Sequence, residues 1–98
     1  MQTLPRPTNK VVNFDKIESM DQANDYALAG YHAAAGKSEK EEGAVGRLWK
    51  DAAEAYHAAY MGIAAIRGLP ADQAIPRARE LLDKANHLAD VAKTRVNS

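Results

Sequence analysis

Glu54 and His57 come closest, in residue type and spacing, to a pair of side chains that could perform chemistry. Three positions apart on a helix, a carboxylate and an imidazole share one face, and carboxylate-bridged di-iron bundles take metal ligands from this Glu-x-x-His pattern. Such a bundle needs two copies of the pattern and two further glutamates, whereas this chain carries one copy. We therefore interpret the pair as a carboxylate and an imidazole on the solvent face of a helix, and we expect no metal and no other cofactor.

Other patterns that support catalysis are missing from the sequence. The histidines, His32, His57 and His87, are too far apart to form the His-x-x-x-His pair of a zinc site. The chain has no cysteine, so it cannot form a disulfide, a thiolate metal site or a cysteine nucleophile. It also lacks a Gly-x-Ser-x-Gly nucleophile elbow and a phosphate-binding loop. We predict that the protein is not an enzyme.

The balance of charge and the spacing of charged residues argue against nucleic acid and membrane as partners. Of the 98 residues, 13 are Lys or Arg and 13 are Asp or Glu, so the formal net charge is zero and no basic cluster is available to a phosphate backbone. Gly43-Ala-Val-Gly46 has the Gly-x-x-Gly form of a nucleotide clamp, but Glu41 and Glu42 directly before it would repel phosphate. The longest stretches without a charged residue, 26–36 and 55–66, are far shorter than the ~20 residues that span a bilayer. We expect a cytoplasmic protein that binds neither nucleic acid nor membrane.

The first helix is indicated by a capping signal and by the spacing of apolar residues. Ser19-Met-Asp-Gln22 has the Ser-x-x-Gln form of a capping box, in which the hydroxyl and the side-chain amide satisfy free backbone N–H groups. Apolar residues then recur every three or four positions, the period of a helix, until Gly36. Because glycine readily adopts the left-handed angles of a helix end, we place this helix at about 19–35.

The second and third helices are bounded by serine, glycine and proline. Ser38-Glu-Lys-Glu41 is another capping box and Gly68-Leu-Pro70 is a strong stop signal, so we place the second helix at about 39–67. Pro76 suits a first helical turn, where a missing N–H costs little, and we place the third helix at about 76–95. No segment alternates apolar and polar residues as a half-buried strand would. These observations predict an all-α fold, a three-helix antiparallel bundle.

The N-terminal residues differ from the rest of the chain. Pro5 and Pro7 each remove an N–H donor and favour extended backbone, and no apolar run follows that would form a secretion signal. We predict an extended N-terminal arm over residues 1–14, joined to a single helical domain over residues 15–98. Two alternatives remain open for the arm, which either packs back across the helices or docks on a partner.

Large aromatic, sulfur-containing and arginine side chains are the candidates for contact with another protein. Tyrosine is frequent at the energetic centres of interfaces because it buries a large area and satisfies a polar tip. Tyr26 lies off the apolar stripe of the first helix, which makes it the strongest candidate among the tyrosines. Two arginines at the start of the third helix are suited to an acidic surface, with a solvated first turn as the alternative. The candidate interaction residues are Phe14, Tyr26, Tyr31, Met61, Arg77 and Arg79.

The second helix is weakly apolar nearly all round, because alanines occupy its other faces beside Met61. A helix of this kind is normally buried on most sides, so we expect a partner, although alanine is also an ordinary helix former. The leading hypothesis is a small non-enzymatic modulator, an adaptor or an inhibitor, that docks on a larger protein target. Inhibitors carried by phages or plasmids are one group of proteins of this size and type. The alternative hypothesis is a structural or assembly subunit that forms a homo-oligomer through the second helix.

Overall fold

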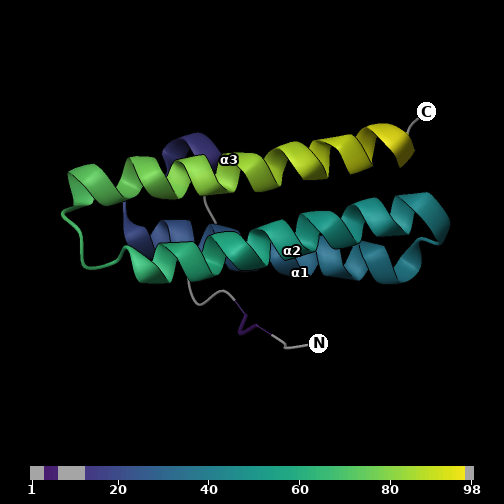
Figure 1. Ribbon diagram of the computed structural model, residues 1–98, viewed down its shortest axis with the longest axis horizontal. Helices are drawn as coiled ribbons and strands as arrows, with labels where there is room; N and C mark the ends of the chain where they lie inside the picture. The colour runs from purple at the N-terminus through teal and green to yellow at the C-terminus, as the bar shows by residue number, and fades with distance from the viewer. Residues whose placement is uncertain (1–3, 7–12, 97–98) are drawn as a thin grey trace.

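Three long helices and one short helical turn make up the structure, a computed structural model that describes residues 4–6 and 13–96. In chain order they are the 3-10 turn η1 (Phe14–Lys16), α1 (Met20–Lys40), α2 (Gly43–Ala65) and α3 (Ala71–Val96). Figure 1 shows α2 running antiparallel to both α1 and α3. The described residues contain no strand, which confirms the all-α three-helix antiparallel bundle. In these same ranges, no helix combines the length and the apolar character needed to cross a bilayer.

The start of α1 lies at the predicted capping box. The Ser19 hydroxyl accepts a hydrogen bond from the Gln22 N–H at 3.1 Å, and the Gln22 side-chain oxygen accepts one from the Glu18 N–H at 2.7 Å. The first bond satisfies an N–H in the first turn that the helix itself leaves without a partner, and the second satisfies the N–H of the residue before the cap. The local sequence therefore determines where this helix begins.

The end of α1 differs from the prediction, because the helix continues through Gly36 as far as Lys40. The additional turn packs along α2, where the Lys37 ammonium lies 4.6 Å from the centroid of the Trp49 ring. A cation over an aromatic face contributes about 0.5–1 kcal/mol, which offsets the similar cost of a glycine inside a helix. Tertiary packing thus decides against a helix end at Gly36.

The second helix is shorter than predicted at both ends. Ser38, which was expected to cap it, lies in α1 and donates its hydroxyl to the Ala35 carbonyl oxygen at 2.8 Å. The turn into α2 falls instead at Gly43, whose φ of 71° is a left-handed angle that residues with a Cβ rarely adopt. At the other end α2 stops at Ala65, short of the predicted end at residue 67.

The third helix begins earlier than predicted, at Ala71 instead of residue 76. Its first turn forms on Pro70, whose carbonyl oxygen accepts hydrogen bonds from the N–H groups of Gln73 and Ala74, both at 2.9 Å. Pro76 therefore lies inside α3, on an exposed position. Proline removes one backbone hydrogen bond there, and the packing of the long helix behind it outweighs that loss.

The core is built mostly from alanine and lies between the three helices. Ile17, Ile63 and Leu82 are the largest fully buried side chains. α2 packs closely against both other helices, whereas α1 and α3 contact each other less. The helices approach so closely that a Cβ on Gly30 of α1 would lie 2.5 Å from Cε1 of Tyr56 on α2. Small residues are therefore required where α1 and α2 face each other.

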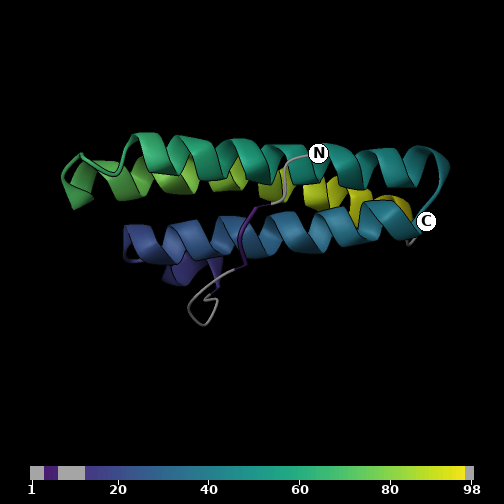
Figure 2. The ribbon, with the colours of Figure 1, turned by 90° about the horizontal axis from the view of Figure 1, so that it is seen from below.

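The N-terminal segment covers one flank of α1. Leu4 is 6% exposed and belongs to the core, and the Pro5 carbonyl oxygen lies 3.0 Å from His32 Nε2, which donates a hydrogen bond to it. Leu28, one turn before His32 and on the same side of α1, is also buried. Figure 2 shows residues 4–6 crossing the surface of α1 at this level.

Of the predicted arm, residues 1–3 and 7–12 lie outside the described residues. Residues 4–6 and 13 have no helical or strand structure, and Phe14 belongs to η1. Of the two alternatives predicted for the arm, residues 4–6 follow the one in which it packs back across the helices.

Candidate interaction surface on α2

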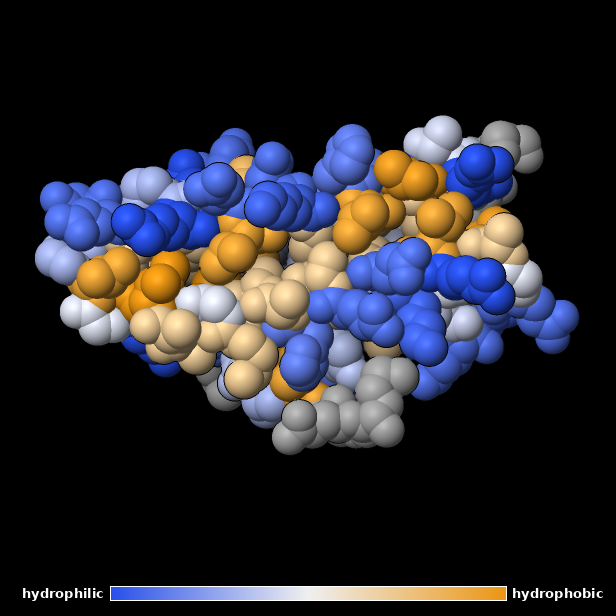
Figure 3. All heavy atoms as spheres, in the orientation of Figure 1, coloured by the Kyte–Doolittle hydropathy of each residue, from blue (hydrophilic) through white to orange (hydrophobic). Residues whose placement is uncertain are grey.

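The outer surface of α2 divides into a charged half and an apolar half. In the N-terminal half, the exposed side chains include Arg47, Lys50, Asp51 and Glu54. From there to the end of the helix the chain has no Asp, Glu, Lys or Arg. Figure 3 shows the same division, with hydrophilic residues over one part of α2 and apolar residues over the other.

The apolar half of α2 is open to solvent. Its exposed residues are all apolar, and Met61 is 54% exposed while Leu69, in the turn that follows, is 36% exposed. Single exposed apolar side chains are ordinary, whereas a contiguous group of them is a candidate interaction surface. We call this group the apolar face of α2, formed by Ala58, Met61, Ala64, Ala65 and Leu69.

Glu54 and His57, the pair with the most suggestive spacing, lie at the boundary between the two halves. They line a hollow of about 400 Å³ between α1 and α2, together with Lys50 and Tyr31. The His57 ring packs beside the Tyr31 ring, with 6.0 Å between the centroids. No group of three or more His, Asp or Glu side chains that could hold a metal occurs in the described part of the chain.

Tyr26 is tied to the interior by a hydrogen-bonded cluster that joins all three helices. Its hydroxyl donates to Asn86 Oδ1 at 3.0 Å, and the Tyr56 hydroxyl donates to the same oxygen. One side chain of α3 thus accepts hydrogen bonds from one tyrosine of α1 and one of α2. We call Tyr26, Tyr56 and Asn86 the tyrosine–asparagine cluster.

Burial determines the acid–base behaviour of this cluster. It raises the pKa of Tyr26, and nearby Asp90 raises it further, while the hydrogen bond to Asn86 lowers it. Burial also raises the pKa of Tyr56, to which Tyr26 and Asp90 add in the same direction. Both hydroxyls therefore stay protonated in the folded protein at pH values where the unfolded chain ionises them.

The raised pKa values predict that the protein loses stability as the pH rises above about 10, the ordinary pKa of tyrosine. Above this pH the unfolded chain binds fewer protons than the folded chain, so the free energy of unfolding falls, by up to about 1.4 kcal/mol per pH unit for the buried Tyr56 and by less for the partly buried, solvent-screened Tyr26. Tyr56→Phe removes one such group. Urea unfolding between pH 9 and about pH 11 should give a shallower decline for the variant, although hydrogen-bond loss makes it about 1 kcal/mol less stable at neutral pH. Equal slopes for the two proteins would contradict this account, because their other titrating groups are the same.

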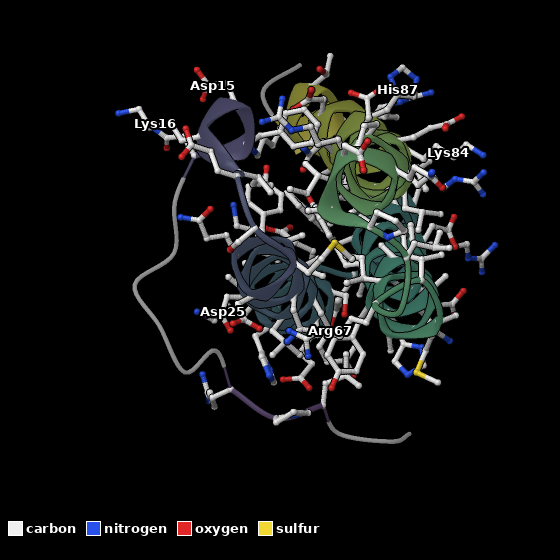
Figure 4. The ribbon with its side chains drawn as sticks, turned by 90° about the vertical axis from the view of Figure 1, so that its left-hand side faces the viewer. Asp15, Lys16, Asp25, Arg67, Lys84 and His87 are labelled. Atoms are coloured by element: carbon white, nitrogen blue, oxygen red, sulfur yellow. The ribbon has the colours of Figure 1, made fainter. Side chains whose placement is uncertain are left out.

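The other candidate interaction residues divide between the interior and the surface. The Phe14 ring packs edge-on against Tyr26 with 5.8 Å between centroids, and the Arg79 guanidinium donates a hydrogen bond to the Ile17 carbonyl oxygen. Figure 4 shows the resulting position of η1, beside α3, with the labelled Asp15 and Lys16 pointing outward.

The remaining candidates differ in burial. Tyr31 is buried at 6% exposure, whereas Arg77, like Met61, is exposed.

Two residues that matter here were not singled out from the sequence. Leu69 was assigned only to the end of the second helix, although it extends the apolar face beyond Ala65. Asn86 accepts hydrogen bonds from tyrosines on two other helices, and no local sequence pattern predicts such a contact. The charge-free stretch 55–66 was visible in the sequence, and it is the signal that locates the apolar face.

The fold and this surface define the class of protein. It is an all-α bundle in which the outer side of α2 exposes an apolar surface to solvent. The chain matches no known family model, no curated protein and no solved structure. Its function is therefore argued from the surface itself.

Proposed function

We propose that this chain is a non-enzymatic interaction protein that docks the apolar face of α2 onto a larger protein and modulates it, as an adaptor or an inhibitor. The observation that carries the proposal is Met61, more than half exposed at 54% in the middle of a charge-free helix surface. An unbranched, polarizable side chain in such a position adapts to varied partner surfaces.

Apolar residues on two other sides of the bundle are covered by the chain itself, and this contrast supports the apolar face of α2 as the docking surface. The chain covers a flank of α1 with Leu4, and it covers the Tyr26 side of the bundle with Phe14. Among the described residues, none covers Met61 or Leu69 to the same extent. Within residues 4–6 and 13–96, the apolar face thus holds the large apolar side chains with most to gain from burial, at about 25 cal/mol for each Å² removed from water.

The proposal is tested by replacing Met61 with glutamate and recovering bound protein from native lysate. We expect Met61→Glu to reduce the recovered target by about tenfold or more, because the carboxylate would be buried without a partner at the interface. An exposed position makes the loss of folding stability small, within about 0.5 kcal/mol.

Ala44→Glu is the matched control, since it places the same side chain on an exposed position at the other end of α2. It should leave the recovered target unchanged. A target that binds Met61→Glu as well as it binds the natural chain would refute docking through the apolar face.

A further inference from the structure

The groove between α1 and α3 is bridged over one part of its length and hollow over another. The Phe14 ring packs against Tyr26 of α1, and Arg79 of α3 donates a hydrogen bond to the carbonyl oxygen of the residue after η1. Past the hydrogen bond between Tyr26 and Asn86, toward the C-terminal ends of both helices, a hollow of about 200 Å³ remains. Figure 1 shows these two ends on the same side of the bundle. The hollow is a place for a small ligand.

The wall of this hollow is mostly apolar. The residues of α1 and α3 that line it between the charged positions project no more than a methyl group, and they are Gly30, Ala33, Ala34 and Ala89. Trp49 and Tyr56 of α2 add two aromatic rings, and the Tyr56 hydroxyl is already bonded to Asn86. Such a wall favours an apolar ligand body. The volume lies below the about 300–1,000 Å³ of drug-sized sites, which limits that body to about one ring.

Two lysines, one from each helix, give the hollow its charge. Lys37 and Lys93 line it, and no acid of the described residues does so. The Lys37 ammonium is held 4.6 Å from the centroid of the Trp49 ring, at the wall itself. Within residues 4–6 and 13–96, neither lysine forms an ion pair with a carboxylate. Asp90, one turn before Lys93, lines a separate hollow. The charge at the site is therefore positive.

Helix dipoles account for the positions of these lysines only in part. Both lie in the last turn of their helices, where the partial negative charge of the helix end favours a cation. Lys40 and Arg95 lie in the same two turns and do not line the hollow. Two cations that share one hollow repel each other, and an anion bound between them reverses the sign of that interaction.

We infer that the hollow between α1 and α3 binds a small organic carboxylate with a single apolar ring. The carboxylate accepts hydrogen bonds from the Lys37 and Lys93 ammonium groups, and the ring lies against Trp49, Tyr56 and the small residues. None of the residues that form the apolar face of α2 lines this hollow. The inference therefore goes beyond the proposed function and does not depend on it.

Benzoate is the probe that tests the inference. Benzamide has the same ring without the charge, and inorganic phosphate has the charge without the ring. Trp49 is the only tryptophan of the chain, so its indole N–H gives a single NMR signal at the wall of the hollow. Titration of the full chain to about 20 mM benzoate should shift this signal to saturation, with a Kd on the order of 1 mM for so small a ligand.

The two comparison ligands should bind at least about tenfold more weakly than benzoate, because each lacks half of the contacts. Benzamide that binds as tightly as benzoate would overturn the role of the lysines. Phosphate that binds as tightly would overturn the role of the ring. A natural chain that does not respond to benzoate overturns the whole inference.

Lys93→Gln tests the charge at the site directly. The position is exposed and the side chain keeps nearly the same length, so folding stability should change by no more than about 0.5 kcal/mol. The variant should bind benzoate about fivefold more weakly or worse. Lys84→Gln is the matched control, since it makes the same change on an exposed position of α3 outside the hollow, and it should bind as the natural chain does. A Lys93→Gln variant that binds benzoate as the natural chain does overturns the inference.

The two proposals fail separately. Met61→Glu should leave benzoate binding unchanged, because Met61 does not line the hollow. A chain that captures a target through Met61 and binds no benzoate would overturn the carboxylate site and leave the proposed function intact. A chain that binds benzoate with the predicted dependence on Lys93 and captures no target would overturn the modulator and leave the carboxylate site intact.

Discussion

Replacing Asn86 with alanine is expected to lower the free energy of unfolding by about 2–3 kcal/mol, although alanine is the better helix former. The change removes the acceptor shared by the Tyr26 and Tyr56 hydroxyls. Tyr56 is only 5% exposed, so water cannot readily replace the lost partner. A buried donor left without an acceptor costs about 1–3 kcal/mol, and here two hydroxyls are affected, one of them half-buried.

A double-mutant cycle separates this effect from ordinary loss of packing. In a Tyr26→Phe, Tyr56→Phe background the two hydroxyls are already absent, so Asn86→Ala should cost less than about 1 kcal/mol. Urea unfolding followed by circular dichroism measures all four proteins. The same cost in both backgrounds would show that Asn86 stabilises the bundle without its bonds to the tyrosines.

The helical fold could be predicted because its signals are local. Ser19 and Gln22 mark the start of α1 by themselves, since the bonds they make lie within one turn. The end of α1 could not be predicted, because Gly36 and Gly43 are both acceptable helix ends by their residue type. The contact of Lys37 with Trp49 favours the longer helix, and that contact exists only once α1 and α2 pack together.

The candidate surface was predicted in part for the same reason. The weakly apolar character of the second helix nearly all round is a property of the sequence, and Met61 was named as a candidate on that ground. The hydrogen bond that holds the partly buried Tyr26 against the core did not follow, because its partner Asn86 is 60 residues away. An aromatic residue that lies outside the apolar stripe of its helix therefore cannot be assigned to the surface or the core of a small bundle until the tertiary structure is known.

Adding a single methyl group at Gly30 is expected to destabilise the bundle by about 2 kcal/mol, because overpacking costs about 1–3 kcal/mol where neighbours cannot yield. A Cβ there would lie 2.5 Å from Cε1 and 2.6 Å from Cδ1 of Tyr56. The Tyr56 ring cannot turn aside without breaking its hydrogen bond to Asn86. The clash therefore forces α1 and α2 apart, and this outweighs the about 0.5–1 kcal/mol that alanine contributes over glycine inside a helix.

Gly36→Ala is the matched control, since it makes the same change in the same helix at a position where a Cβ would meet nothing within 4 Å. It should stabilise the protein by about 0.5–1 kcal/mol, so that the two variants shift the urea midpoint in opposite directions. Tyr56→Leu, which removes the ring, should reduce the cost of Gly30→Ala. If Gly30→Ala were as stable as Gly36→Ala, the close approach of α1 to α2 at Tyr56 would be refuted, and with it the need for small residues between these helices.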